Sequence, residues 1–292
     1  MSQFLQQLIN GISLGSIYAL IALGYTMVYG IIKLINFAHG DIYMLGAYVG
    51  FVFANKTGLG FFPTLVVAMV FCSTLGVLIE IIAYKPLRNA TRITALITAI
   101  GVSYFLEAST QKVMGASPRA FPTLLPNGLL TLGSVTITYQ QVFILLVTFV
   151  LMLLLQFIVT KTKIGRAMRA VSVDTDAARL MGVNVDQTIS FTFALGSALA
   201  GAAGVLVGMY YSSINPLMGL IPGVKAFIAA VFGGIGIIPG AMLGGVLIGV
   251  IESLVSGYGS SLYKDAVVYV ILIIILVVKP AGLLGKNVRE KV

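Results

Sequence analysis

Long apolar runs separated by short polar turns extend along the whole chain. Segments such as "VFILLVTFVLMLLLQFIV" show no alternation of polar and apolar positions, so they predict helices and not strands. About 20 apolar residues in a helix cross the roughly 30 Å hydrocarbon core of a bilayer. The runs predict spans at 5–32, 38–56, 62–84, 93–112, 139–160, 188–211, 222–234, 238–256 and 264–280.

This pattern predicts an all-α polytopic membrane protein, a bundle of about 8 to 10 transmembrane or re-entrant helices. Composition agrees, because 59% of the residues are hydrophobic and 9% are charged, whereas soluble domains carry about 25% charged residues. No stretch has the composition of a separate soluble domain. The lipid bilayer is therefore the first partner that the sequence implies.

Cations between the spans predict the orientation of the bundle. The positive-inside rule places three clusters in the cytoplasm, including one at the C-terminus. The first 32 residues carry no Lys or Arg, so we expect the N-terminus and the loop 113–138 outside, with 222–256 crossing twice. Orientation also explains the net charge of +9 without a nucleic acid partner. The clusters are Lys85, Arg88 and Arg92; Lys161, Lys163, Arg166, Arg169 and Arg179; and Lys286, Arg289 and Lys291.

One polar stretch, "KTKIGRAMRAVSVDTDAARLMGVNVDQ" at 161–187, interrupts the apolar pattern. It predicts two short helices, the second capped by Asp174 and ended by Gly182, with Asp186 capping the next membrane helix. Small and apolar residues among the charges would suit the groove of a partner. The alternative is a loop that only fixes topology, which needs cations but neither acids nor capped helices. The small and apolar residues are Ala177, Ala178, Leu180 and Met181.

Part of this stretch, "DAARLMG", resembles the E-A-A-x-x-x-G loop of ABC importer permeases, with Asp176 in place of the usual Glu. In that family the loop is cytoplasmic and docks on the ATPase subunit. Three further blocks resemble the branched-chain amino acid ABC permeases, specifically the H-type subunit of the LIV system. They are "NGISLGSIYALIALGYTMVYGIIKLINFAHGDIYMLGAY", "AVFGGIGIIPGAMLGGVLIG" and "KPAGLLGK".

The resemblance implies one permease subunit of a heteromeric importer in a bacterial or archaeal cytoplasmic membrane. The implied partners are a second, M-type permease, two ATP-binding-cassette ATPase subunits and an extracellular binding protein. Leucine, isoleucine and valine are the implied substrates, although relatives carry urea or amides. We therefore expect 1–292 to form a single transmembrane permease domain that includes an ATPase-coupling segment at about 161–187. The expected coupling residues are Gly165, Arg166, Arg169, Asp174, Asp176, Ala177, Ala178 and Gly182.

ATP hydrolysis requires a loop that cradles phosphate, and the motif G-x-x-x-x-G-K-[ST] does not occur in this sequence. We expect ATP to be used by partner subunits and this chain to bind no cofactor of its own. His39 and Cys72 are the only residues of their types, which leaves no Cys/His metal cluster within one chain. An intramembrane enzyme is disfavoured because His39 and Asp41, two positions apart, would not share a helix face.

The motif "INFAHGD" places polar residues where the chain turns back after the first span. One interpretation is a substrate gate or broken helix whose free backbone groups touch the solute. The other is capping, in which Asn36 or Asp41 satisfies backbone groups and His39 is simply hydrogen-bonded. Because the topology puts this turn near the cytoplasmic side, capping is the favoured interpretation. The candidate path or gate residues are Asn36, His39, Gly40 and Asp41.

Acidic residues inside the spans have two interpretations as well. Glu80, Glu107 and Glu252 could carry protons in a secondary transporter, or could be solvated at the interface or pair with Lys85, Lys112 or Lys225. Their small number and their positions near the span ends favour interface solvation or pairing.

Small residues recur at every fourth position in two spans and predict close helix packing, although they could also form sliding surfaces. A weak internal similarity between 19–50 and 226–249 suggests broken helices. The two stripes are Gly196, Ala200, Gly204 and Gly208, and Ala241, Gly245, Gly249 and Ser253.

Overall fold

The computed structural model of the chain describes residues 2–34, 36–88, 90–126, 128–133 and 135–285. A helix lies at every predicted span, with bounds within three residues of the predicted ones once the turns after α3 are included. The all-α polytopic prediction is confirmed. The helices at these spans are α1 (Ser2–Ile32), α2 (His39–Thr57), α3 (Phe61–Ile79), α4 (Arg92–Met114), α5 (Tyr139–Lys161), α8 (Val185–Tyr211), α9 (Leu220–Gly233), α10 (Ile238–Tyr258) and α11 (Lys264–Val278).

Six of the described helices are long and apolar enough to cross a membrane on their own: α1, α3 with its following turns, α4, α5, α8 and α10. Helix α3 continues into a π-helical turn, η1 (Glu80–Tyr84), and a 3₁₀ turn, η2 (Lys85–Leu87). The predicted loop 113–138 contains short strands that its polar and proline-rich sequence did not indicate. Strands β2 (Leu129–Leu132) and β3 (Val135–Thr138) form a hairpin, and β1 (Arg119–Ala120) pairs with β4 (Ser213–Ile214).

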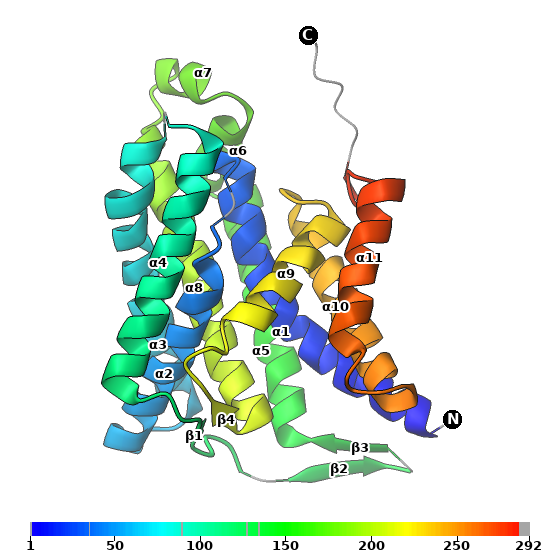
Figure 1. The fold of residues 1–292 in the computed structure, drawn as a ribbon. Coiled ribbons are helices and arrows are strands. Elements are labelled where there is room, and N and C mark those ends of the chain that lie inside the picture. Colours follow the sequence, from blue (N-terminus) through cyan, green and yellow to red (C-terminus); the bar gives the residue numbers. More distant parts are fainter. Residues whose placement is uncertain (1, 35, 89, 127, 134, 286–292) are drawn as a thin grey trace.

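The bundle has two distinct ends, which we call the α7 end and the strand end (Figure 1). Two short helices, α6 (Lys163–Val173) and α7 (Thr175–Leu180), protrude at the α7 end, where α4 begins and α11 finishes. The strands and the start of α1 lie at the strand end. Two of the three predicted cation clusters thus share one end of the bundle, and the third, at 286–291, lies outside the described residues.

Helices α1 and α8 form the buried centre of the bundle, and their small residues allow backbones to approach closely. A Cβ at Gly204 of α8 would lie 2.6 Å from the Ala47 nitrogen of α2. Likewise, a Cβ at Gly245 of α10 would lie 2.6 Å from the Ala19 Cβ of α1. Both glycine stripes are therefore packing seams, as the four-residue spacing predicts.

Each central helix is followed by an extended segment and then by a helix that starts inside the bundle (Figure 1). Helix α2 follows α1 in this way, and α9 follows α8 from the opposite end. Helix α10 packs along α1, and α3 packs along α8. The chain thus contains an inverted repeat that relates α1–α3 to α8–α10. Broken helices are present, as the similarity between 19–50 and 226–249 suggested, because each segment contains the end of one helix and the start of the next.

Candidate functional site: the α7 segment and the break between α1 and α2

The polar stretch 161–187 folds into the two short helices that its capping residues predict. Thr162 accepts a hydrogen bond from the Gly165 backbone and caps α6. Asp174 Oδ1 accepts from the Asp176 and Ala177 backbone nitrogens at 2.9 Å each, so it caps α7. Gly182 has a φ of +82° and ends the helix, while the Val183 N–H bonds the Ala178 carbonyl. This is the hydrogen-bond pattern of a Schellman turn.

The tip of α7 presents apolar side chains to the surroundings. Leu180 is 89% exposed and Met181 is 85% exposed. Ala178 is buried beneath them and Ala177 is exposed. Asp176 and Arg179 flank this tip as an exposed pair, with 3.8 Å between Oδ1 and Nη1. An apolar tip with charged flanks is suited to a partner's groove, as the sequence indicated.

The predicted coupling residues in α6 occupy two kinds of position. Gly165 is buried, and any side chain there would overlap the Ile158 and Val159 carbonyls at the end of α5. Arg169 donates to the Val159 carbonyl, so this cation holds α6 against α5. Arg166 is exposed on the outer surface of α6. Arg169 is exposed as well, so both cations of α6 are placed where a partner can contact them, whereas Gly165 is not.

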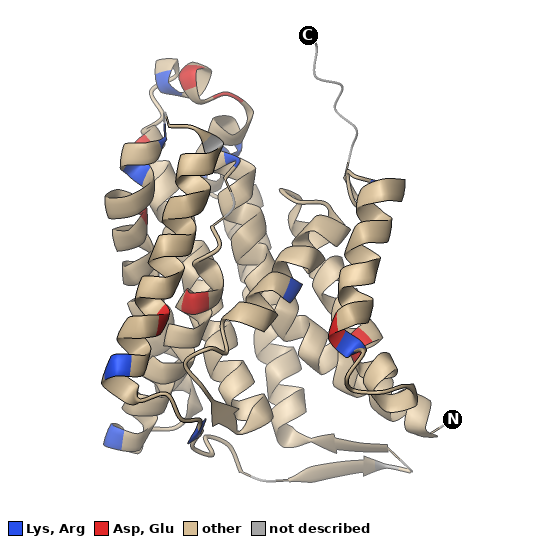
Figure 2. Ribbon diagram, viewed as in Figure 1, with Lys and Arg blue, Asp and Glu red and all other residues tan. Residues whose placement is uncertain are grey.

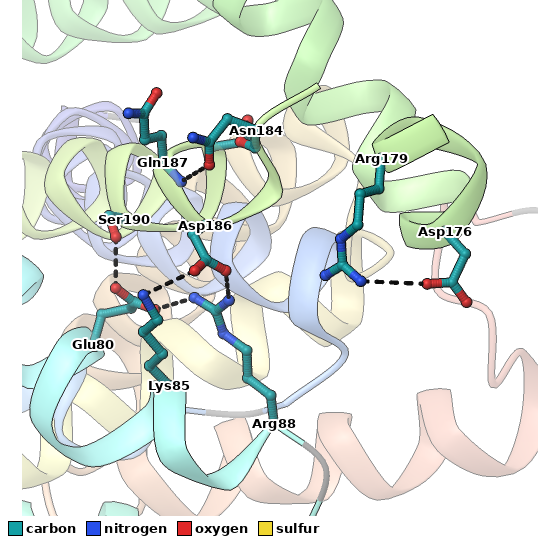
Figure 3. Close-up of polar contacts among 10 residues, drawn as sticks. Glu80, Lys85, Arg88, Asp176, Arg179, Asn184, Asp186, Gln187 and Ser190 are labelled. Atoms are coloured by element: carbon teal, nitrogen blue, oxygen red, sulfur yellow. Dashed lines mark hydrogen bonds and ion pairs between the residues drawn. The ribbon is translucent and has the colours of Figure 1, made fainter. Parts of the chain in front are cut away.

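A network of ion pairs joins the exit of this segment to the end of α3 (Figure 3). Asp186, in the first turn of α8, pairs with Lys85 at 2.8 Å and with Arg88. Arg88 also pairs with Glu80, which is fully buried and accepts a hydrogen bond from Ser190 at 2.6 Å. Asp186 is therefore not the cap of α8. Asn184 takes that role by accepting from the Gln187 backbone at 3.0 Å.

The same network ends on the break between α1 and α2. Glu80 opens the π-helical turn η1, a rare geometry that is frequent at functional sites. Tyr84 closes this turn and donates its hydroxyl to Asn36 Oδ1 at 2.8 Å. A cavity of about 590 Å³ lies between these groups and the α6–α7 connection. The α7 segment, residues 161–187, is thus connected to the break between α1 and α2 by polar contacts that lie beside this cavity.

Residues 36–41 of the motif "INFAHGD" lie inside the bundle and not at its surface. A side chain at Gly24 of α1 would overlap the His39 ring. Gly24 lies eight residues before the end of α1, so His39 sits roughly 12 Å inside the bundle along that helix. Asn36, His39 and Asp41 are buried, and no side chain caps α2. The favoured capping interpretation is therefore wrong.

Two helix starts meet at this depth. A Cβ at Gly40, in α2, would lie 2.5 Å from the Gly219 carbonyl oxygen just before α9, and a Cβ at Gly219 would lie 2.6 Å from the Gly40 oxygen. Asp41 beside them accepts from Ser103 of α4 at 2.5 Å. Only glycine permits this contact, so both positions serve the close approach of two broken helices.

The three acidic residues of the spans have different partners. Glu252 pairs with Lys225 at 2.8 Å, as predicted. Glu80 pairs with Arg88 instead of Lys85, because Lys85 points to Asp186. Glu107 is buried beside the break, and among the described residues it makes no ion pair with Lys112. Charge pairing inside the bundle is therefore real, but its partners depend on the fold.

Broken helices that meet inside a bundle, buried ion pairs and a protruding helical segment together define a multi-pass transport permease. Comparison with known proteins identifies the family. The model described as "Branched-chain amino acid transport system / permease component" matches residues 7–276. The chain belongs to this family, which confirms the resemblance seen in the sequence.

Relatives match over nearly the full length of this chain. It is 47% identical to the high-affinity branched-chain amino acid transport system permease protein LivH of Escherichia coli K12, over 99% of this chain and 98% of that protein. It is 44% identical to the corresponding permease protein BraD of Pseudomonas aeruginosa, with the same coverage. PsaBC from Streptococcus pneumoniae in complex with Fab has the same fold, with a TM-score of 0.51, 14% identity and coverage of 96% and 93%.

Proposed function

We propose that this chain is the membrane-spanning permease subunit of an ATP-binding-cassette importer for leucine, isoleucine and valine. An extracellular binding protein delivers the amino acid, a second permease completes the pathway, and two separate ATPase subunits hydrolyse ATP. The α7 end then faces the cytoplasm and the N-terminus lies outside. Full-length similarity to LivH and BraD supports the substrate class.

One observation supports the proposal that this chain transports the amino acid while a separate subunit hydrolyses ATP. The α7 segment projects an uncovered apolar tip, Leu180 and Met181, from an end of the bundle where charged residues gather (Figure 2). Two such side chains each gain about 1.5–3 kcal/mol when buried, which favours a docked partner. The sequence carries no phosphate-cradling motif of its own. An ATPase bound at this tip supplies the missing energy source.

The contacts from this tip suggest how a partner's motion reaches the solute. Movement of 161–187 displaces Asp186, which is tied through Arg88 and Glu80 to η1. Tyr84 of η1 then pulls on Asn36 at the start of the break. Coupling of this kind requires an element with two arrangements, and the break between α1 and α2 is the element proposed.

Co-purification with the partner subunits, followed by ATPase measurement, tests the proposal. Leucine-loaded binding protein is expected to stimulate ATP hydrolysis by the assembled complex in proteoliposomes. The same binding protein without ligand serves as the control. Stimulation by a urea-loaded or amide-loaded binding protein, and none by the leucine-loaded one, would contradict the proposed substrate.

A further inference from the structure

A second polar site lies away from the α7 segment, around a cavity of about 510 Å³. Helices α1, α2, α8, α9, α10 and α11 all contribute to its wall, together with the segment after β4. Its volume falls in the range of about 300–1,000 Å³ that is typical of small-molecule sites. The cavity is therefore large enough for an amino acid.

Charges of both signs line one side of this cavity. Lys225 Nζ lies 2.8 Å from Glu252 Oε1 and 2.6 Å from Asp265 Oδ1, and both Lys225 and Glu252 are almost fully buried. Lys264 lies 3.5 Å from the same Glu252 oxygen, and Tyr18 donates to the other one. Two ammonium groups thus face two carboxylates. Ionisable groups this deep in a membrane protein usually mark a solute or ion pathway.

The hydroxyl of Tyr43 provides an independent sign of a missing ligand. Tyr43 is fully buried on α2 and lines the cavity. Among the described residues its hydroxyl has no hydrogen-bond partner. A buried hydroxyl without a partner is unfavourable, so a polar group of a ligand in the cavity would stabilise it by accepting or donating a hydrogen bond.

Aliphatic side chains belong to the wall of the cavity as well. Val207, Leu217, Met218 and Ile221 line it, and they come from α8, from the segment before α9 and from α9 itself. A wall that combines clustered charges of both signs with aliphatic groups matches a zwitterion with an aliphatic side chain.

We propose that this cavity binds the amino acid within the permease, an inference that rests on the proposed function and assigns its substrate site. The ammonium of the ligand binds Glu252 and Asp265. Its carboxylate binds Lys264 and the Tyr43 hydroxyl, and its side chain packs on the aliphatic wall. Lys264 and Asp265 are each about one third exposed, so they can exchange partners. The ligand ammonium replaces Lys264 on Glu252, the ligand carboxylate becomes the partner of Lys264, and Lys225 keeps its contact with Glu252, so no buried charge is left unpaired.

Tyr43→Phe tests this site because it removes one oxygen and keeps the ring. Tyr48→Phe is a matched control. Tyr48 lies on the same helix, is also buried and has no hydroxyl partner in the described part of the chain, but it lines a different cavity. Both variants are assembled with the partner subunits in proteoliposomes. Leucine uptake and ATP hydrolysis are then measured at saturating binding protein.

Tyr43→Phe is expected to lower maximal uptake about tenfold, which is the effect of one lost hydrogen bond to a charged group. The rate of ATP hydrolysis is expected to stay close to that of the Tyr48→Phe complex. Lys264→Met is expected to lower uptake in the same way. Equal uptake by Tyr43→Phe and Tyr48→Phe would contradict the assignment of this cavity as the amino acid site. Absence of leucine uptake by the unaltered complex would instead contradict the proposed function.

Discussion

Replacing both Leu180 and Met181 by aspartate is expected to remove the ATPase subunits from the purified complex. The two side chains are almost fully exposed and form the apolar tip of α7. Losing their burial costs about 3–6 kcal/mol in total, which corresponds to roughly a hundredfold to ten-thousandfold weaker binding. Quantitative co-purification from membranes measures the effect.

Leu262→Asp is the matched control for this prediction. Leu262 is 87% exposed in the connection between α10 and α11, at the other end of the bundle from α7. This variant is expected to keep the full amount of bound ATPase. Normal ATPase content in the Leu180→Asp, Met181→Asp double variant would favour the alternative, in which 161–187 only fixes topology.

Arg88→Ala is expected to destabilise the fold strongly. Arg88 is the ion-pair partner of Glu80, which is fully buried. Removing one partner of a buried pair leaves an uncompensated charge and costs about 3–5 kcal/mol. The free energy of unfolding, measured by denaturant titration in mixed micelles, gives the value directly.

Two further variants distinguish the contribution of the buried Arg88–Glu80 pair to stability from that of the exposed Lys85–Asp186 pair. Lys85→Ala removes the other cation on Asp186, but both groups of that pair are nearly half exposed, so a loss of less than about 1 kcal/mol is expected. The double variant Glu80→Gln, Arg88→Met removes both charges and is expected to recover much of the stability. An Arg88→Ala variant as stable as Lys85→Ala would contradict the assigned role of the network.

The α7 segment could be predicted from the sequence because its signals are local. Asp174 caps a helix that begins one residue later, and Gly182 ends it at a left-handed backbone position. Capping and turn preferences act over a few residues and need no knowledge of the fold. The contacts that Gly165 and Arg169 make with the end of α5 had no such local signal, because they depend on how α6 folds back on α5.

The polar network could not be predicted in the same way. Arg88 and Asp186 are 98 positions apart, and only the packing of α3 beside α8 brings them together. Asp186 was expected to cap α8, yet the nearby cations take its carboxylate and Asn184 supplies the cap.

The depth of the break between α1 and α2 inside the bundle could not be predicted from the sequence either. Hydropathy located both helices around "INFAHGD" but gave no sign that the segment between them returns into the bundle. Contact between Gly40 and Gly219 fixes that depth, and it joins the two halves of the inverted repeat. Pairings between distant segments of this kind depend on tertiary packing, which local patterns do not encode.

Uptake by the chain in proteoliposomes, with and without its partners, tests the central claim most directly. With the second permease, the ATPase subunits and loaded binding protein, leucine is expected to accumulate only when ATP is supplied. The chain alone is expected to move no leucine under an imposed proton or sodium gradient. Gradient-driven uptake by the isolated chain would identify a secondary transporter and would contradict the account.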